Sequence, residues 1–263
     1  MKEKMRSSII LFSLLFIFGG HAAEPAAAKA ATPPRSEDRV TIEKRRVVIV
    51  RTGKFVRDFP TRRRAVITYP FIKSGASNAA VLRKIRSLLQ IKNIFDTSLA
   101  EYRADTWLDE FDYKVNYNKN FILDITFMQN GMGAYPDGQT KNFAISLKTG
   151  ELIKARDIFK PEALKTLSAM VDKKLQEENE RTIKESTGDA ALTEEDKEML
   201  RALKFEVANL DDFSIGDKGI TFLFDAGFPH VIQALEPAGE YFFSYAELRP
   251  YIKPEGAVGL LAR

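Results

Sequence analysis

Alternating apolar and polar positions in the middle of the chain predict a series of antiparallel strands. Tyr113, Val115 and Tyr117 would share one face of a strand, because successive strand side chains point to opposite faces. An Asn-Lys-Asn turn follows, and two further strands repeat the alternation, which is typical of a meander. The apolar positions of these two strands are Phe121, Leu123, Ile125 and Phe127, then Phe143, Ile145 and Leu147.

The residues before this meander predict two strands and one helix. Val47–Val50 and Ala65–Tyr69 are β-branched runs, and we expect the second to stop at Pro70. Between Ala79 and Gln90 the apolar residues recur at helical spacing, with Ser77 or Asn78 as the N-cap.

Helices and a second strand cluster follow toward the C-terminus. Pro161 begins a long helix at a position that tolerates proline, and Thr193 begins a shorter one with a pattern close to a capping box. A Gly216–Gly219 turn indicates a hairpin, a last strand follows, and Ser244 begins a final short helix.

Strand clusters separated by helices favour an α+β fold of antiparallel β-meanders packed with a few helices. We expect two small consecutive subdomains, at residues 46–130 and 131–255, and a tail at 256–263.

The first residues have the pattern of a secretory signal peptide. Lys2, Lys4 and Arg6 precede the apolar run Ile9–Phe18, and small residues then permit cleavage near Ala22. The apolar run is about half of the roughly 20 residues that a membrane span needs. Residues 23–45 are rich in alanine, proline and charge, and predict a disordered leader. We therefore expect export to the periplasm or medium, as a soluble protein without a transmembrane segment after cleavage.

Composition excludes several kinds of site. The chain has no cysteine and two histidines, of which only His230 would remain after cleavage. Cys-His and multi-histidine metal sites are therefore excluded, and a Ser-His-Asp triad could use only His230. Cleavage would lower the net charge from +4 to +2, which gives no reason to expect nucleic-acid binding. We expect no catalytic residue, metal or cofactor.

Charge is unevenly spread along the chain. Arg35–Arg64 contains eleven basic and four acidic residues, whereas Glu177–Asp217 contains thirteen acidic and five basic residues. The basic stretch, with its Arg45–Arg64 cluster, would suit anionic envelope polymers or lipid head groups in a membrane-surface protein. Two solvated surfaces explain the same pattern.

Two segments are candidates for binding. In the predicted glycine-rich loop Asn130–Gly138, Tyr135 offers a stacking surface beside Pro136, and Asp137 offers an acceptor. The segment would equally serve as a long hairpin connection. At a Gly-Pro break farther along, the candidates are Phe228 and His230, although a lone histidine often has a structural role.

An enzymatic alternative uses carboxylates. Asp225 and Glu236 could form the acid pair of a wall-active glycan hydrolase, a reaction that needs no histidine. Trp107, the only tryptophan, lies among apolar residues and is expected in the core rather than at a sugar platform.

Two stretches carry a family resemblance. The first runs from Tyr117 to Phe159 and includes NFAISLKTGELIKARDIF; the second runs from Ile220 to Tyr251 and reads ITFLFDAGFPHVIQALEPAGEYFFSYAELRPYI. Together they resemble the exported bacterial domain of unknown function of the lysozyme-sensing anti-sigma factor RsiV and the peptidoglycan deacetylase PdaC, where it stands apart from the catalytic domain. Residues 46–131 are similar to the smaller domain that usually precedes it.

The resemblance implies an α+β accessory or recognition domain of the cell envelope. Many members have a Gly-Ala-His-Gly-like turn where this chain has Gly133-Ala134-Tyr135-Pro136-Asp137-Gly138. They also tend to have a Pro-Tyr-Ala-Gly-like turn where this chain has Phe228-Pro229-His230. Both differences fall at the expected contact surface, so partner identity does not carry over.

The sequence therefore predicts a non-enzymatic binding protein of the bacterial envelope. Its expected partner is peptidoglycan or a wall-acting protein such as lysozyme, bound through Tyr135, Pro136, Asp137, Phe228 and His230.

Overall fold

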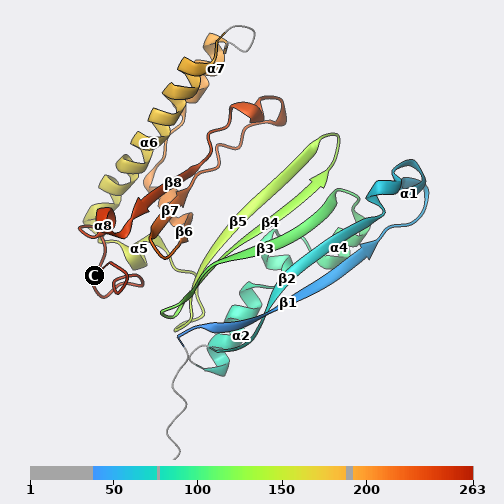
Figure 1. The fold of residues 1–263 in the computed structure, drawn as a ribbon, viewed down its shortest axis with the longest axis horizontal. Helices are drawn as coiled ribbons and strands as arrows, with labels where there is room; N and C mark the ends of the chain where they lie inside the picture. Colours follow the sequence, from blue (N-terminus) through green and yellow to red (C-terminus); the bar gives the residue numbers. More distant parts are fainter. Residues whose placement is uncertain (1–37, 76–77, 188–191, 263) are drawn as a thin grey trace, which may run out of the picture. The chain divides into compact units, whose positions relative to one another are not determined.

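The computed structural model describes residues 38–75, 78–187 and 192–262, and within them the fold is α+β (Figure 1), as the sequence predicts. It contains a five-stranded sheet and a three-stranded sheet. The predicted signal peptide and most of the predicted leader lie outside the described residues. No described helix is long and apolar enough to cross a membrane.

The first sheet has the strand order β1-β2-β3-β4-β5. Neighbours are antiparallel except β2 and β3, which pair in parallel at Val66 and Ile67 because helices, rather than a tight turn, connect them. The strands are β1 (Val40–Val50), β2 (Arg64–Gly75), β3 (Leu108–Lys119), β4 (Ile122–Met132) and β5 (Pro136–Ser146).

Helices α2 (Ala79–Leu88), α3 (Ile91–Ile94) and α4 (Leu99–Ala104) connect β2 to β3 and cover one face of this sheet (Figure 1). Asn78 caps α2 as predicted, because its side chain accepts hydrogen bonds from the backbone of Ala80 and Val81. Before β2, the chain forms α1 (Lys54–Asp58) and the 3-10 helix η1 (Pro60–Arg62).

Two strands extend farther than the sequence predicts. Within the described residues, β1 begins at Val40, five residues before the predicted end of the leader at position 45. The prediction that the second strand stops at Pro70 is wrong, since β2 continues to Gly75. Pairing with β3 covers only Val66 and Ile67, so one edge of β2 is unpaired at Pro70, a setting that tolerates proline.

The C-terminal half builds the three-stranded sheet β6-β7-β8, against which α6 packs. Thr193 and Ser244 form the capping boxes of α7 and α8, which confirms these helix starts. The elements are α5 (Ala155–Ile158), η2 (Pro161–Ala163), α6 (Leu164–Glu185), α7 (Glu194–Ala202), η4 (Val207–Asp211), β6 (Phe213–Ile215), β7 (Gly219–Leu223), η5 (His230–Leu235), β8 (Glu240–Ser244) and α8 (Tyr245–Leu248).

Side-chain alternation divides the core into two clusters. Leu123 points into the cluster between the first sheet and its helices, whereas the adjacent Ile122 points into the cluster around the second sheet. The predicted boundary at residues 130 and 131 falls inside β4, which pairs with β3 and β5. The predicted tail contributes Val258 and Ala262 to the second cluster.

A polar network joins the two sheets where β6 contacts β3, β4 and β5. The fully buried Asp124 carboxylate on β4 accepts hydrogen bonds from Ser214 and from the backbone N–H of Ile215, both on β6. It also accepts from Asn116 on β3 and Asn142 on β5, at 2.8 and 3.1 Å.

Candidate functional site

The first candidate segment forms the tight end of the β4–β5 hairpin. The prediction of a long glycine-rich loop over residues 130–138 is wrong, because only residues 133–135 connect the two strands. Gly131 pairs with Asp137, and Met132 pairs with Pro136. The two strands therefore continue through Gly131 and Gly138. Glycine is required at position 131 because a residue distant in the sequence packs closely against it, and not because the chain turns there.

That neighbour is Trp107, which packs against the hairpin. A Cβ atom at Gly131 would lie 2.3 Å from the Trp107 carbonyl oxygen and 2.7 Å from indole atom Cδ2. The Trp107 carbonyl accepts hydrogen bonds from the Met132 N–H at 2.9 Å and from Arg62 Nη2 at 3.0 Å. Trp107 is half-buried and packs against the first core cluster, while its indole also lies 3.8 Å from the Cβ position of Gly133.

The end of the same hairpin exposes apolar and aromatic side chains. Tyr135 is 62% exposed and Met132 is 39% exposed. Pro136 and Asp137 are also exposed, and the Asp137 carboxylate accepts a hydrogen bond from the Gly138 N–H at 2.7 Å. We call Trp107, Met132, Tyr135, Pro136 and Asp137 the hairpin surface.

A chain of side-chain hydrogen bonds supports the hairpin from inside. The Tyr102 hydroxyl on α4 donates to Gln129 on β4, whose amide nitrogen donates to Gln139 on β5 at 2.8 Å. Burial raises the pKa of Tyr102 to about 12, so the hydroxyl remains a protonated donor at alkaline pH as well. These hydrogen bonds therefore connect both strands of the hairpin to α4 in the helical layer.

The other predicted contact residues lie in the second sheet's connection between β7 and β8. Phe228 is half-buried, and His230 begins η5, with its side chain outside what the structure describes. The predicted set therefore divides between two connections that belong to different sheets (Figure 1).

The structure brings together the carboxylates of the enzymatic alternative. Burial, a hydrogen bond with the Asp225 side chain and the charge of Asp225 together raise the pKa of Glu236. Glu236 Oε1 also accepts hydrogen bonds from the backbone N–H groups of Ala226 and Gly227, both at 3.1 Å. The pair thus closes the connection that contains Phe228 and His230.

This contact differs from the arrangement of a glycosidase. Retaining and inverting enzymes separate their two carboxyl groups by about 5–9.5 Å, leaving room for the sugar or for water. Asp225 and Glu236 instead lie close enough for the Asp225 side chain to raise the pKa of Glu236. Among the described residues, no group of three or more His, Cys, Asp or Glu side chains is arranged to hold a metal ion.

Comparison with known proteins identifies a family segment and related folds. Residues 156–227 match the model of DUF3298, described as a protein of unknown function. A crystal structure of a DUF3298 member from Bacteroides fragilis has a TM-score of 0.54 at 14% identity, covering 86% of this chain and 99% of that chain. A DUF3298 protein from Pseudomonas aeruginosa has a TM-score of 0.51 at 12% identity, covering 84% and 98%. No curated protein matches the chain.

The resemblance to a domain of unknown function is thereby confirmed, and the structural likeness at these identities shows a common fold. The finer similarity to RsiV and PdaC stays a prediction. The matched segment begins in α5 and ends at Gly227, so it includes Asp225 but neither the hairpin surface nor Glu236.

Proposed function

We propose that this protein is a non-enzymatic binding protein of the bacterial cell envelope that recognises peptidoglycan glycan through the hairpin surface. The observation that carries the proposal is the exposed Tyr135 at a turn packed against Trp107. Aromatic rings provide large, rigid contact area, and the apolar face of a sugar ring can stack on them.

The surroundings of these rings favour binding over catalysis. Asp137 offers carboxylate oxygens to sugar hydroxyls, and backbone hydrogen bonds hold Trp107 in place before any ligand arrives. Such preorganisation lowers the entropy lost on binding. The sequence-based expectation of export agrees with a wall ligand.

Retention on insoluble peptidoglycan tests the proposal. We expect the purified protein to sediment with peptidoglycan, and Tyr135→Ala to weaken this binding about threefold to tenfold, the loss of one aromatic contact. Phe242→Ala is the matched control, because Phe242 is 48% exposed but lies on β8 of the other sheet.

Immobilised lysozyme provides the second arm of this experiment. Retention on lysozyme alone, weakened by Tyr135→Ala, would assign the hairpin surface to a wall-acting protein instead of glycan. Equal binding by the Tyr135 and Phe242 variants, or no retention on either material at micromolar protein, would refute a role for the hairpin surface.

The contact between Asp225 and Glu236 supports one rival, a wall-active hydrolase. A muropeptide-release assay with the wild-type protein and Glu236→Gln separates the two functions. Release by the wild type that disappears in the variant would establish the hydrolase. The two backbone hydrogen bonds that Glu236 accepts from Ala226 and Gly227 favour a structural role in closing the β7–β8 connection.

A further inference from the structure

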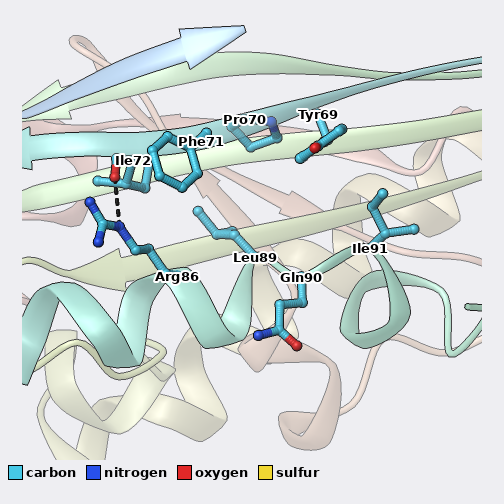
Figure 2. A pocket seen from close by; sticks show the side chains of 8 residues that line it. All are labelled: Tyr69, Pro70, Phe71, Ile72, Arg86, Leu89, Gln90 and Ile91. Carbon is cyan, nitrogen blue, oxygen red and sulfur yellow. Dashed lines mark hydrogen bonds between the residues drawn. The ribbon is translucent and has the colours of Figure 1, made fainter. Parts of the chain in front are cut away.

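A separate pocket lies between β2 and the junction of α2 and α3 (Figure 2). Its volume is about 320 Å³, at the lower end of the 300–1,000 Å³ or so that is usual for small-molecule sites. It belongs to neither the hairpin surface nor the β7–β8 connection. The lining residues are Tyr69, Pro70, Phe71, Ile72, Arg86, Leu89, Gln90 and Ile91.

Apolar side chains form the body of the pocket. The helical segment turns at Leu89, the residue that caps α2, and continues into α3 at Ile91. Figure 2 shows Leu89 and Ile91 pointing toward β2, where Tyr69 and Phe71 are half-buried. Leu89 is buried, whereas Ile91 is half-buried, so Tyr69, Phe71 and Ile91 leave apolar surface that a ligand would cover.

Two guanidinium groups flank the aromatic wall. The Cζ atom of Arg45 lies 3.4 Å from the centroid of the Phe71 ring, and that of Arg86 lies 4.9 Å from it. Arg45 has an acidic partner in Glu43 at 3.2 Å. Arg86 forms no ion pair with any residue in 38–75, 78–187 or 192–262.

Arg86 is nevertheless held in place. Its Nε donates to the Ile72 carbonyl at 2.8 Å, and its Nη2 donates to the Lys73 carbonyl at 3.0 Å, as Figure 2 shows for Ile72. These neutral acceptors orient the guanidinium without neutralising it. A guanidinium has five N–H donors, so Arg86 can still donate to an anionic oxygen at the pocket.

We propose that this pocket binds a small anionic amphiphile, with its apolar body between β2 and the helices and its anionic head group at Arg86. The apolar lining accounts for the body, and charge complementarity with the unneutralised guanidinium accounts for the head. A carboxylate or a phosphate monoester meets this requirement.

Calorimetric titration of the whole protein tests the site with three probes of equal chain length. Decanoate and decyl phosphate carry an anionic head, whereas decanol does not. We expect one molecule of an anionic probe to bind, and decanol to bind at least about tenfold more weakly, since hydrogen bonds to charged groups contribute about 1.5–3 kcal/mol. The tighter of the two anions identifies the head group.

Variants locate the binding. Arg86→Gln should weaken the anionic probe about tenfold and bring its affinity close to that of decanol. Ile91→Glu should abolish anion binding by placing a carboxylate at the pocket, and its half-exposed position favours retention of the fold. Lys92→Glu is the control, because Lys92 is exposed in the same short helix but does not line the pocket.

Circular dichroism of each variant separates lost binding from lost structure. Failure of both anions to bind the wild type at millimolar concentration would overturn the proposal. Equal affinities for decanol and decanoate, or unchanged binding in folded Ile91→Glu, would do the same. A comparable loss in Lys92→Glu would indicate general surface electrostatics and would also contradict a defined site.

Discussion

The Asp124 carboxylate lies at the junction of the two sheets and accepts two hydrogen bonds on each oxygen. Asn116 and Ser214 donate to Oδ1, while Asn142 and the Ile215 N–H donate to Oδ2. Burial raises the pKa of Asp124, and these four hydrogen bonds act in the opposite direction. Because all four partners donate, the ionised carboxylate matches the site better than any neutral group of similar shape.

Asp124→Asn should therefore lower the free energy of unfolding by about 2–4 kcal/mol, because the new amide nitrogen would face two donors. Ser214→Ala removes a single donor and should cost about 1 kcal/mol. Urea unfolding measures both values. Wild-type stability in Asp124→Asn would show that the network contributes little to the junction.

Packing against a residue that is distant in the sequence determines the residue type at position 131. Gly131→Ala should destabilise the protein by about 1–3 kcal/mol, because its Cβ would overlap the Trp107 backbone and indole. Gly133→Ala is the control, since its Cβ would be in ordinary contact with Trp107 Cδ1 at 3.8 Å. Urea unfolding followed by the fluorescence of the single tryptophan measures both changes; equal effects of the two substitutions would contradict this explanation.

At the scale of elements, three helix starts were predicted because capping is local. The side chains of Asn78, Thr193 and Ser244 bond to backbone within three residues, so the sequence contains the whole signal. The β4–β5 hairpin was predicted less well. Its glycines resemble a loop signal, and nothing near Gly131 in the sequence indicates that Trp107 lies against it. The placement of Tyr135 at an exposed turn was predicted, whereas the support from Trp107 was not.

The connection between β7 and β8 should respond to pH through Glu236, whose pKa is raised. The folded protein therefore holds this proton at pH values where the unfolded chain has released it. Stability from Glu236 is fully present below its ordinary pKa of about 4.5 and is lost as pH rises through the raised value.

Glu236→Gln lacks this titration. We expect its stability relative to the wild type to improve between pH 4 and pH 7, as measured by urea unfolding midpoints. If the difference in stability between Glu236→Gln and the wild type stayed constant over this pH range, Glu236 would have the same pKa in the folded and unfolded states. Asp225→Asn removes the neighbouring charge and should reduce the same pH dependence.

At the scale of the whole molecule, the first sheet depends on residues on both sides of position 130. β5 covers the outer edge of β4 along its whole length, and Phe143 and Ile145 complete the core beside Ile125 and Leu123. The parallel pairing of β2 with β3 was not predicted, because strand order depends on how the helical crossover packs rather than on local patterning.

A chain that ends at residue 130 should consequently fail to fold. It would lose β5 and expose the edge of β4, which favours aggregation. Circular dichroism and size-exclusion chromatography of residues 38–130, compared with the full chain, check this expectation. A monomeric fragment with a cooperative unfolding transition would instead support an independent N-terminal subdomain.

Because β1 lies at the edge of its sheet, the basic residues of that strand have a second role. Lys44, Arg45 and Arg46, together with Glu43, interrupt an otherwise β-branched strand whose outer edge has no partner strand among the described residues, and Val48 and Val50 are exposed beside them. Charges on an open edge act as gatekeepers, because a second molecule that added its own β1 there would bring like charges together. Self-association through this strand is thereby opposed in every copy of the protein.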